Sequence, residues 1–205
     1  MLCLPNALII NNIFSHLYPS DLEKCKEANP GMKSIIENNE EYIDKICQHI
    51  QPHGEQNKYY NNGQLKIKCY YKEGKKCGER KKWYENGQLR CQKFYKDGKE
   101  HGESKHWYKG TGQIWSQCYY KDGKLHGEFK EWYEGGHPER DPQLSFQEYY
   151  KDGDLDGESK GWHTNGQLSI HEYYKEGKEY GEHKYWYENG QLKYQKFYND
   201  GKLVE

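Results

Sequence analysis

The segment GERKKWYENGQLRCQKFYKDGKEH, residues 78–101, is one copy of a unit that recurs six times along the chain. Each copy starts with the dipeptide Gly-Glu, at residues 54, 78, 102, 127, 157 and 181, so successive copies are 24, 24, 25, 30 and 24 residues apart. A fixed period of roughly 20 to 50 residues is typical of proteins built from stacked similar units. The sequence therefore predicts six repeats, at residues 54–77, 78–101, 102–126, 127–156, 157–180 and 181–205.

Two turn signals punctuate the units. The first is Asn-Gly, at 62–63, 86–87, 165–166 and 189–190, and the second is Asp-Gly or Glu-Gly, at 73–74, 97–98, 122–123, 152–153, 176–177 and 200–201. Two-residue hairpin loops need positive φ at their centre, which Gly, Asn and Asp tolerate best. We therefore expect tight β-hairpins, with two short strands in each repeat.

Aromatic side chains recur at fixed positions of these strands. The first strand aligns Tyr59, Trp83, Trp107, Trp132, Trp162 and Trp186, and the second aligns Leu65, Leu89, Ile114, Leu144, Leu168 and Leu192, as well as Tyr70, Phe94, Tyr119, Tyr149, Tyr173 and Phe197. With 33% hydrophobic and 31% charged residues, the chain has little material for a thick core. The predicted fold is a mainly β repeat protein, a single-layer antiparallel meander of stacked β-hairpins, in which the aromatic rows pack; an exposed peptide-binding groove is the alternative.

The units resemble MORN repeats, in particular their variant class, through the segments YKDGKEHGE (95–103) and YKDGKLHGE (120–128). The resemblance implies an elongated, gently curved array of β-hairpins that acts as a scaffold for protein assembly. Contact with membrane lipids is proposed for some members of this family.

One repeat departs strongly from the others. At 135–143 the sequence Gly-Gly-His-Pro-Glu-Arg-Asp-Pro-Gln replaces Asn-Gly-Gln and lengthens the loop by six residues, as the spacing of 30 in place of 24 records. We expect a protruding loop. Insertions in repeat arrays often lie on binding faces, although loops also accept neutral insertions. The candidate target-binding residues in this loop are His137, Pro138, Glu139, Arg140, Asp141 and Pro142.

Residues 1–50 lack the repeat and show helical spacing instead. Apolar residues from Leu8 to Leu17 form one stripe, Ser20 and Glu23 form a capping box for a second helix, and a third amphipathic stretch runs from Tyr42 to Ile50. The sequence predicts a small N-terminal three-helix α module.

This module resembles an F-box, through Leu-Pro-x-x-Leu-Ile-Ile-x-x-Ile-Phe-Ser-x-Leu at 4–17 and Pro-Ser-Asp-Leu-x-x-Cys at 19–25. The resemblance implies a partner, the Skp-type adaptor of a cullin–RING ubiquitin ligase, while the repeats would select a target protein. Ala7 stands where the family has an acidic residue, and Met32 stands where it has Trp. The implied adaptor contacts are Leu4, Pro5, Leu8, Ile9, Ile13, Phe14, Leu17 and Leu22.

The alternative is a structural or membrane-proximal scaffold in which the N-terminal helices only cap an open sheet edge. Membrane lipid is kept as a partner of this alternative, because lysines recur at two positions of the repeat. These are Lys81, Lys105, Lys130, Lys160 and Lys184 at one position, and Lys72, Lys96, Lys121, Lys151 and Lys175 at the other.

Composition and motifs also argue against several classes of function. A net charge of −1 argues against nucleic-acid binding, and seven cysteines without a C-x-x-C pair favour a reducing compartment. No zinc spacing, phosphate loop or nucleophile motif occurs, so we expect no metal, no cofactor and no catalytic residues, hence no enzyme. The combination of modules resembles F-box and MORN-repeat proteins of large DNA viruses, which predicts a cytoplasmic location, in the host if the chain is viral.

Overall fold

In the computed structural model of the chain, the structure describes residues 54–135 and 142–204. The chain divides into two units, Met1–His53 and Gly54–Glu205. Everything described belongs to the second unit, so the helices expected in residues 1–50 lie outside the described residues.

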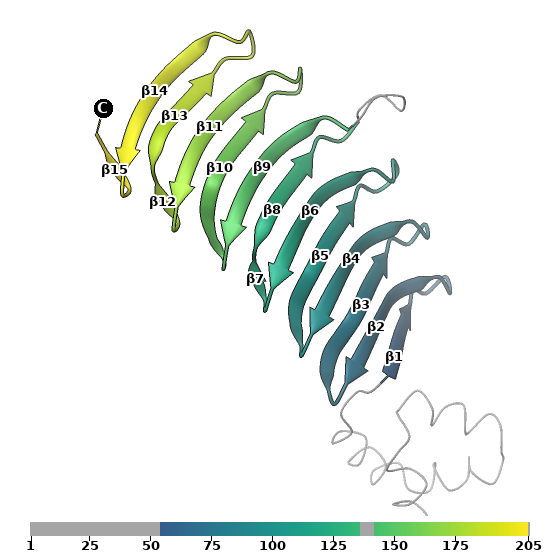
Figure 1. Cartoon of the computed structure of the whole chain (residues 1–205). Helices are drawn as coiled ribbons and strands as arrows, with labels where there is room; N and C mark the ends of the chain where they lie inside the picture. Colours follow the sequence, from purple (N-terminus) through teal and green to yellow (C-terminus); the bar gives the residue numbers. More distant parts are fainter. Residues whose placement is uncertain (1–53, 136–141, 205) are drawn as a thin grey trace, which may run out of the picture. The chain divides into compact units, whose positions relative to one another are not determined.

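The second unit is built from β-strands in sequence order (Figure 1). Its strands are β1 Gly54–Tyr59, β2 Leu65–Lys72, β3 Lys75–Trp83, β4 Leu89–Lys96, β5 Lys99–Trp107, β6 Ile114–Lys121, β7 Lys124–Leu125, β8 Gly127–Trp132, β9 Leu144–Lys151, β10 Asp154–Trp162, β11 Leu168–Lys175, β12 Lys178–Glu179, β13 Gly181–Trp186, β14 Leu192–Asn199 and β15 Lys202–Leu203.

All of these strands belong to one sheet, in which each long strand pairs antiparallel with the strands before and after it in the chain. β7 and β12 are short segments that pair with β6 and β11, one residue ahead of β8 and β13. Figure 1 shows the strands side by side in one curved layer. The predicted antiparallel meander of stacked hairpins is therefore confirmed.

The Asp-Gly and Glu-Gly turns are two-residue loops, as predicted. Between the paired residues Lys72 and Lys75, Glu73 and Gly74 both have positive φ, 49° and 74°. The other five turns repeat this conformation at Asp97, Asp122, Asp152, Glu176 and Asp200. Positive φ at both central residues matches the twist of the flanking strands and explains why each of these turns ends in Gly.

The Asn-Gly turns differ from the prediction. Gly63 has a φ of 81°, but Asn62 does not have positive φ. The Gly63 N–H donates to the Tyr60 carbonyl over 2.9 Å, and the Tyr60 N–H donates to the Gln64 carbonyl over 2.8 Å, so three residues form the loop. Asn62 contributes through its side chain, because its Oδ1 accepts from the Gln64 N–H over 3.0 Å. The expectation of a two-residue loop with a positive-φ Asn was wrong here, since a side-chain hydrogen bond explains the Asn equally well.

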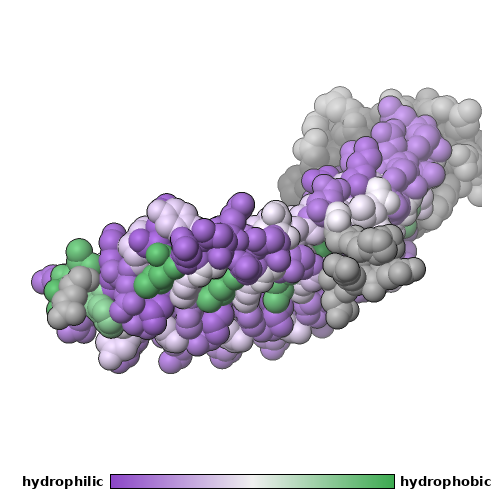
Figure 2. All heavy atoms as spheres, turned by 90° about the horizontal axis from the view of Figure 1, so that it is seen from above, coloured by the Kyte–Doolittle hydropathy of each residue, from purple (hydrophilic) through white to green (hydrophobic). Residues whose placement is uncertain are grey.

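Burial within this sheet is shallow. The buried side chains are small or polar: Cys69, Cys91, Cys118, Ser104, Ser116, Ser159 and His183. Figure 2 shows a surface on which hydrophilic residues dominate and hydrophobic residues form small separate spots. Cross-strand pairs, instead of a thick apolar interior, must therefore provide most of the stabilisation.

Candidate functional site

The register of the strands divides the side chains of the sheet between two faces. Directly paired residues of antiparallel strands share a face, and alternate residues along one strand also share a face, except where the register shifts. One such shift lies between Lys82 and Trp83, opposite the extra residue Arg90. Glu79, Lys81 and Trp83 of β3 therefore lie on one side, and Arg80 and Lys82 lie on the other. We call the first the constant face and the second the variable face, for reasons that follow.

The constant face carries nearly the same residues in every repeat. The Trp positions pair with the Leu or Ile positions, as in Trp83 with Leu89 and Trp107 with Ile114, so the predicted aromatic row packs against the aliphatic row. The Glu of Gly-Glu pairs with the Tyr or Phe position, as in Glu103 with Tyr119.

The recurrent Glu organises this face. Glu103 forms an ion pair with Lys105 at 2.8 Å, and it accepts hydrogen bonds from Gln117 over 2.8 Å and from Tyr119 over 3.3 Å. Glu128 does the same with Lys130 at 2.7 Å and with its own Gln and Tyr. All six equivalent carboxylates form an ion pair with a Lys, four accept from a Gln and four accept from a Tyr. They form part of the repeat framework, not a unique acid–base pair.

Electrostatics agree with this role. Hydrogen bonds from Tyr70, Lys68 and Asn57 lower the pKa of Glu55 to about 2. The hydrogen bond from Lys160 likewise lowers the pKa of Glu158. The first of the two predicted lysine rows, which includes Lys105 and Lys130, is thus neutralised by its glutamates.

The variable face changes from repeat to repeat. An unbroken series of cross-strand pairs runs along it, from Lys58 through Lys82, Cys91, His106 and beyond to Tyr194. Its central residues are Gln56, Lys58, Ile67 and Cys69 in the first repeat, Arg80, Lys82, Cys91 and Lys93 in the second, Ser104, His106, Ser116 and Cys118 in the third, Phe129, Glu131, Phe146 and Glu148 in the fourth, Ser159, Gly161, Ile170 and Glu172 in the fifth, and His183, Tyr185, Tyr194 and Lys196 in the sixth.

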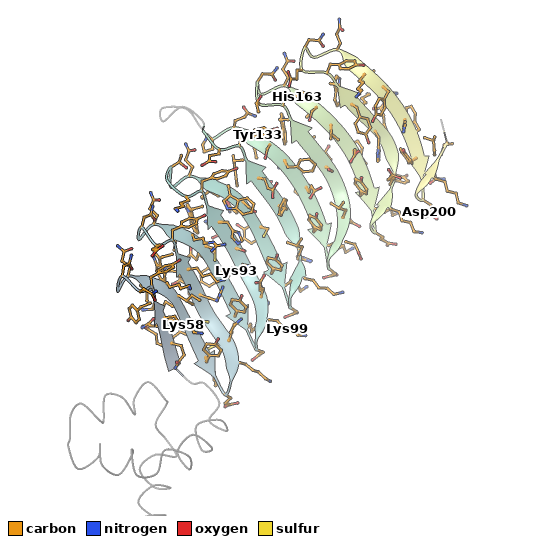
Figure 3. All side chains as sticks on the ribbon, turned by 180° about the vertical axis from the view of Figure 1, so that it is seen from behind. Lys58, Lys93, Lys99, Tyr133, His163 and Asp200 are labelled. Carbon is orange, nitrogen blue, oxygen red and sulfur yellow. The ribbon has the colours of Figure 1, made fainter. Side chains whose placement is uncertain are left out.

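The second repeat makes one part of the variable face basic. Burial and the neighbouring Arg80 lower the pKa of Lys82, and Arg90 and Lys93 act in the same direction. Lys93 is compensated, because Glu100 lies 2.7 Å from its Nζ. Figure 3 shows Lys93 midway along the strands, between the two rows of turns. We call Arg80, Lys82, Arg90 and Lys93 the basic block; in the described part of the chain, its first three members form no ion pair.

The fourth and fifth repeats make another part acidic. Burial raises the pKa of Glu131, and Glu148 raises it further. Tyr150 donates to Glu148 over 2.7 Å, and Tyr174 donates to Glu172 over 3.0 Å, with a second hydrogen bond to Glu172 from Tyr185. We call Glu131, Glu148 and Glu172 the acidic block.

The third repeat separates these two blocks with uncharged, mostly small residues. Ser104 and Cys118 are buried to 1% and 4% exposure, and they pair directly with each other. Cys69, Cys91 and Cys118 are free thiols of the variable face, and they show that the cysteines act there as small buried residues.

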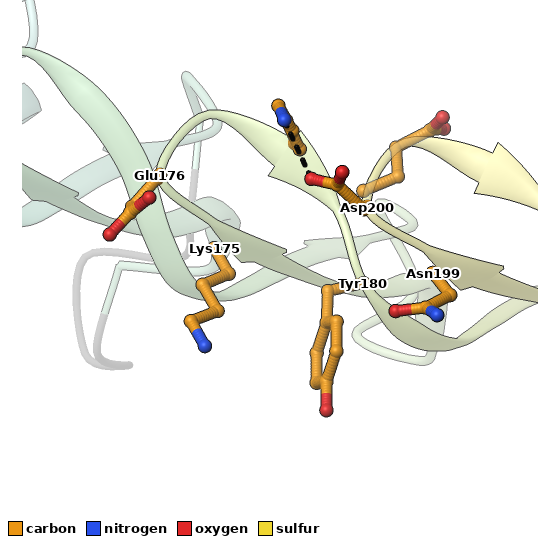
Figure 4. A pocket seen from close by; sticks show the side chains of 7 residues that line it. Lys175, Glu176, Tyr180, Asn199 and Asp200 are labelled. Atoms are coloured by element: carbon orange, nitrogen blue, oxygen red, sulfur yellow. Dashed lines mark hydrogen bonds and ion pairs between the residues drawn. The ribbon is translucent and has the colours of Figure 1, made fainter.

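The pockets of the sheet lie elsewhere. A cavity of about 270 Å³ lies between the last two repeats, where Lys175, Tyr180 and Asp200 are among its lining residues (Figure 4). Lys178 forms an ion pair with Asp200 there, at 2.6 Å. A smaller cavity of about 140 Å³ is lined by the equivalent residues of the first two repeats, among them Lys72 and Asp97. Because both cavities lie at the same position of the repeat, they are a consequence of how neighbouring turns pack and not a specific ligand site.

The sequence-predicted sites mostly cannot be placed. The implied adaptor contacts, Leu4 to Leu22, and the loop residues His137 to Asp141 lie outside the described residues; Pro142 is exposed. The sequence reasoning missed the variable face. Comparison of the repeats for their differences, combined with the alternation of side chains along a strand, would have indicated it.

Residues 54–135 and 142–204 lack two further features. These residues hold no group of three or more His, Cys, Asp or Glu side chains placed to bind a metal ion. They also include no helix with the length and apolar character needed to cross a membrane.

Comparison with known proteins identifies the repeat. No curated protein matches the chain. The model of the MORN repeat variant family matches residues 52–73, 76–97, 125–141, 155–176 and 179–200, slightly more than half of the chain. The third repeat is not matched, yet β5 and β6 pair there as the corresponding strands do in its neighbours. The chain belongs to the MORN repeat variant family.

Proposed function

We propose that this protein is a non-enzymatic protein–protein interaction adaptor. In this proposal the F-box-like residues 1–50 recruit a Skp-type adaptor of a cullin–RING ubiquitin ligase, and the repeats bind a target protein. The observation that carries the binding part is the contrast between two faces of one sheet. One face repeats a Glu–Lys ion pair in all six repeats, whereas the other changes from repeat to repeat and carries separate charged blocks.

Framework and recognition are usually separated in this way in repeat proteins. Each unit contacts mainly its neighbours, so residues that hold the stack must recur, whereas residues that contact a partner are free to differ. A protein partner fits a face with basic, neutral and acidic regions better than a uniformly charged ligand does.

The ubiquitin-ligase part rests on the sequence of residues 4–25 alone. In this proposal Leu8, Ile13 and Leu17 would contribute an apolar stripe to the adaptor. The protein would then work in the cytoplasm, the host cytoplasm if the chain is viral.

The test is capture of the intact chain by purified Skp-type adaptor. Circular dichroism first shows that the wild type and the double variant Ile13→Asp, Leu17→Asp both keep the β-sheet signal. We then expect the adaptor to capture the wild type but not the double variant. A variant with Lys99→Gln at a turn serves as a control and should be captured like the wild type. If neither wild type nor variant is captured, the adaptor part is wrong and the helices are better regarded as a cap.

One observation supports the alternative of a membrane-proximal scaffold. The second predicted lysine row, Lys72, Lys96, Lys121, Lys151 and Lys175, is exposed where the two-residue turns begin, and Lys75, Lys99, Lys124 and Lys178 follow those turns. Figure 3 shows Lys99 and Asp200 along this edge. Each of the six turns carries one acidic residue, such as Asp97 or Asp122, and together these offset two thirds of the nine lysine charges. Sedimentation with vesicles that contain anionic lipid, at physiological salt, tests the alternative. We expect no binding, and retention on such vesicles would favour the scaffold.

A further inference from the structure

The arrangement of charges on the variable face lowers the folding stability of the free protein. Lys82 lies near three other cations, and no carboxylate is among the groups that shift its pKa most. Glu131 is held near Glu148, and it forms no ion pair with a described residue. Like charges held together and partly removed from water are unfavourable for folding. By contrast, each Glu of the constant face has its Lys within reach, as at Glu79 with Lys81.

The two blocks lie at a defined separation on one face. From β4, which carries Lys93, to β9, which carries Glu148, the sheet order runs through β5, β6 and β8. At about 4.8 Å for each step between neighbouring strands, these four steps correspond to roughly 19 Å. Between them, Ser104 and Ser116 are buried, and the rings of His106 and Trp115 lie with their centroids 5.3 Å apart. A bound segment would therefore cross these uncharged side chains on its way from one block to the other.

We propose that the variable face binds a polypeptide segment of mixed charge, with an acidic stretch over the basic block and a basic stretch over the acidic block. This inference rests on the proposed function of the repeats as a target-binding array. It adds which face binds the target, in which orientation, and the charge pattern that the target must carry.

The charge pattern favours a polypeptide over the other anionic ligands. Nucleic acids and anionic membranes are negative throughout, so they would be attracted to Lys82 but repelled by Glu131 and Glu148. A polypeptide can reverse its charge within the required distance. At roughly 3.3 Å per residue, an extended segment spans 19 Å with about six residues, which sets the spacing between its acidic and basic stretches.

The neutral variants Lys82→Gln and Glu131→Gln test the proposal, each with a matched control on the same strand. Lys81→Gln on β3 and Glu128→Gln on β8 remove the same charges from the constant face. The probe is a displayed library of random 16-residue peptides, selected on the full-length wild-type chain. The enriched peptides are then synthesised, and their affinities are measured for the wild type and the four variants.

We expect enriched peptides to carry acidic and basic stretches about six residues apart. Lys82→Gln and Glu131→Gln should each weaken their binding about tenfold, the size of one favourable charge pair at a partly buried interface. Lys81→Gln and Glu128→Gln should change it less than twofold. Rescue completes the test: a peptide with its acidic stretch replaced by lysines should bind Lys82→Glu better than it binds the wild type.

The outcomes separate this inference from the proposed function. Peptides that bind but ignore both Lys82→Gln and Glu131→Gln would leave the array a target-binding module and overturn the assignment of the face. A second outcome would also overturn it: only Lys82→Gln weakens peptide binding, and inorganic phosphate or anionic vesicles displace the peptide. That result would indicate a simple anion site. A library that yields no binder would count against both proposals.

Discussion

At the scale of single residues, the most informative side chain is the Glu that follows each strand glycine. The sequence shows that this Glu recurs in all six repeats, but it does not identify the contacts. The structure shows that one carboxylate accepts from a Lys, a Gln and a Tyr of its own hairpin, as Glu103 does. These partners were visible as recurrent residues, yet only the register of the strands brings them to one place.

These carboxylates make stability sensitive to acid. The pKa of Glu55 falls from 4.5 to about 2, and the pKa values of Glu79, Glu128 and Glu158 are also lowered. A depressed folded-state pKa stabilises the protein above the unfolded-state pKa, and this contribution is lost as pH falls through the folded-state value. Burial lowers the pKa of His106 from 6.5 to about 4, so its neutral form adds a second loss on acidification. We therefore expect the melting temperature to begin to fall below about pH 6.5 and to fall further between about pH 4.5 and pH 2.

Thermal unfolding at a series of pH values, followed by circular dichroism, measures this dependence. The variant Glu158→Gln should melt lower than the wild type at pH 7 and lose less on acidification. A melting temperature that stays level down to pH 2 would contradict the assigned role of the glutamates.

At the scale of strands and hairpins, a recurrent tyrosine joins successive repeats. The Tyr84 hydroxyl donates to the backbone carbonyl of Trp107, in the next repeat, over 2.8 Å. Tyr60, Tyr108 and Tyr133 make the equivalent bond, and in the fifth repeat His163 takes the place of the Tyr. Tyr133 and His163 lie toward the same edge of the sheet in Figure 3. The Tyr next to each Trp was visible in the sequence, but its partner is a backbone atom and has no sequence signal.

Removal of one such hydroxyl should weaken the contact between two repeats. Tyr84→Phe leaves the Trp107 carbonyl without its donor, which should lower the free energy of unfolding by about 1 kcal/mol. Tyr187→Phe is the matched control, because its ring is 50% exposed and it occupies the same position in the last repeat, where no further repeat follows in the described residues. Urea denaturation compares the two; equal losses would show that the bond between repeats contributes nothing.

The two faces of one strand should respond in opposite ways when a lysine is neutralised. Lys82→Gln removes a cation that burial and Arg80 disfavour, so it should raise the free energy of unfolding by a few tenths of a kcal/mol. Lys81→Gln breaks the ion pair with Glu79 and should lower it by a similar amount. Glu131→Gln should act at pH 7 as Lys82→Gln does, because its raised pKa means that ionisation disfavours the folded state. Denaturation at low salt checks these signs, and destabilisation by Lys82→Gln would contradict them.

At the scale of the whole repeat array, the sheet is a one-dimensional stack. Each hairpin pairs only with the one before and the one after it, and the order β1 to β15 has no crossover. Stability in such a stack is close to a sum of units and their interfaces. Nothing in the fold requires the last hairpin for the first one to form.

Removal of residues 181–205 should therefore leave a folded array. This deletion takes away β13 to β15 and the pairing of β11 with β13, such as Ile170 with Tyr185, but leaves all earlier pairs intact. We expect the β-sheet signal per residue in circular dichroism to persist, with a melting temperature lower by a few degrees. Loss of the whole β-sheet signal would show long-range cooperativity that the strand order does not suggest.

The period, the two turns of each unit, the two strands between them and the recurrent aromatic and leucine rows all followed from amino-acid order. They depend on local backbone preferences, such as positive φ at Asp-Gly, and on a pattern repeated often enough to be recognised. The three-residue form of the Asn-Gly loops, the bond from Tyr84 to a neighbouring carbonyl and the division into constant and variable faces did not follow from it. At the strand glycines, the order of residues does not predict the face on which a side chain lies. Gly78 has positive φ, and the register shifts beside it, between its neighbours' partners Cys69 and Tyr70. Such a shift changes which residues share a side of the sheet, so Lys82, Cys91 and His106 become neighbours only when the strands have paired.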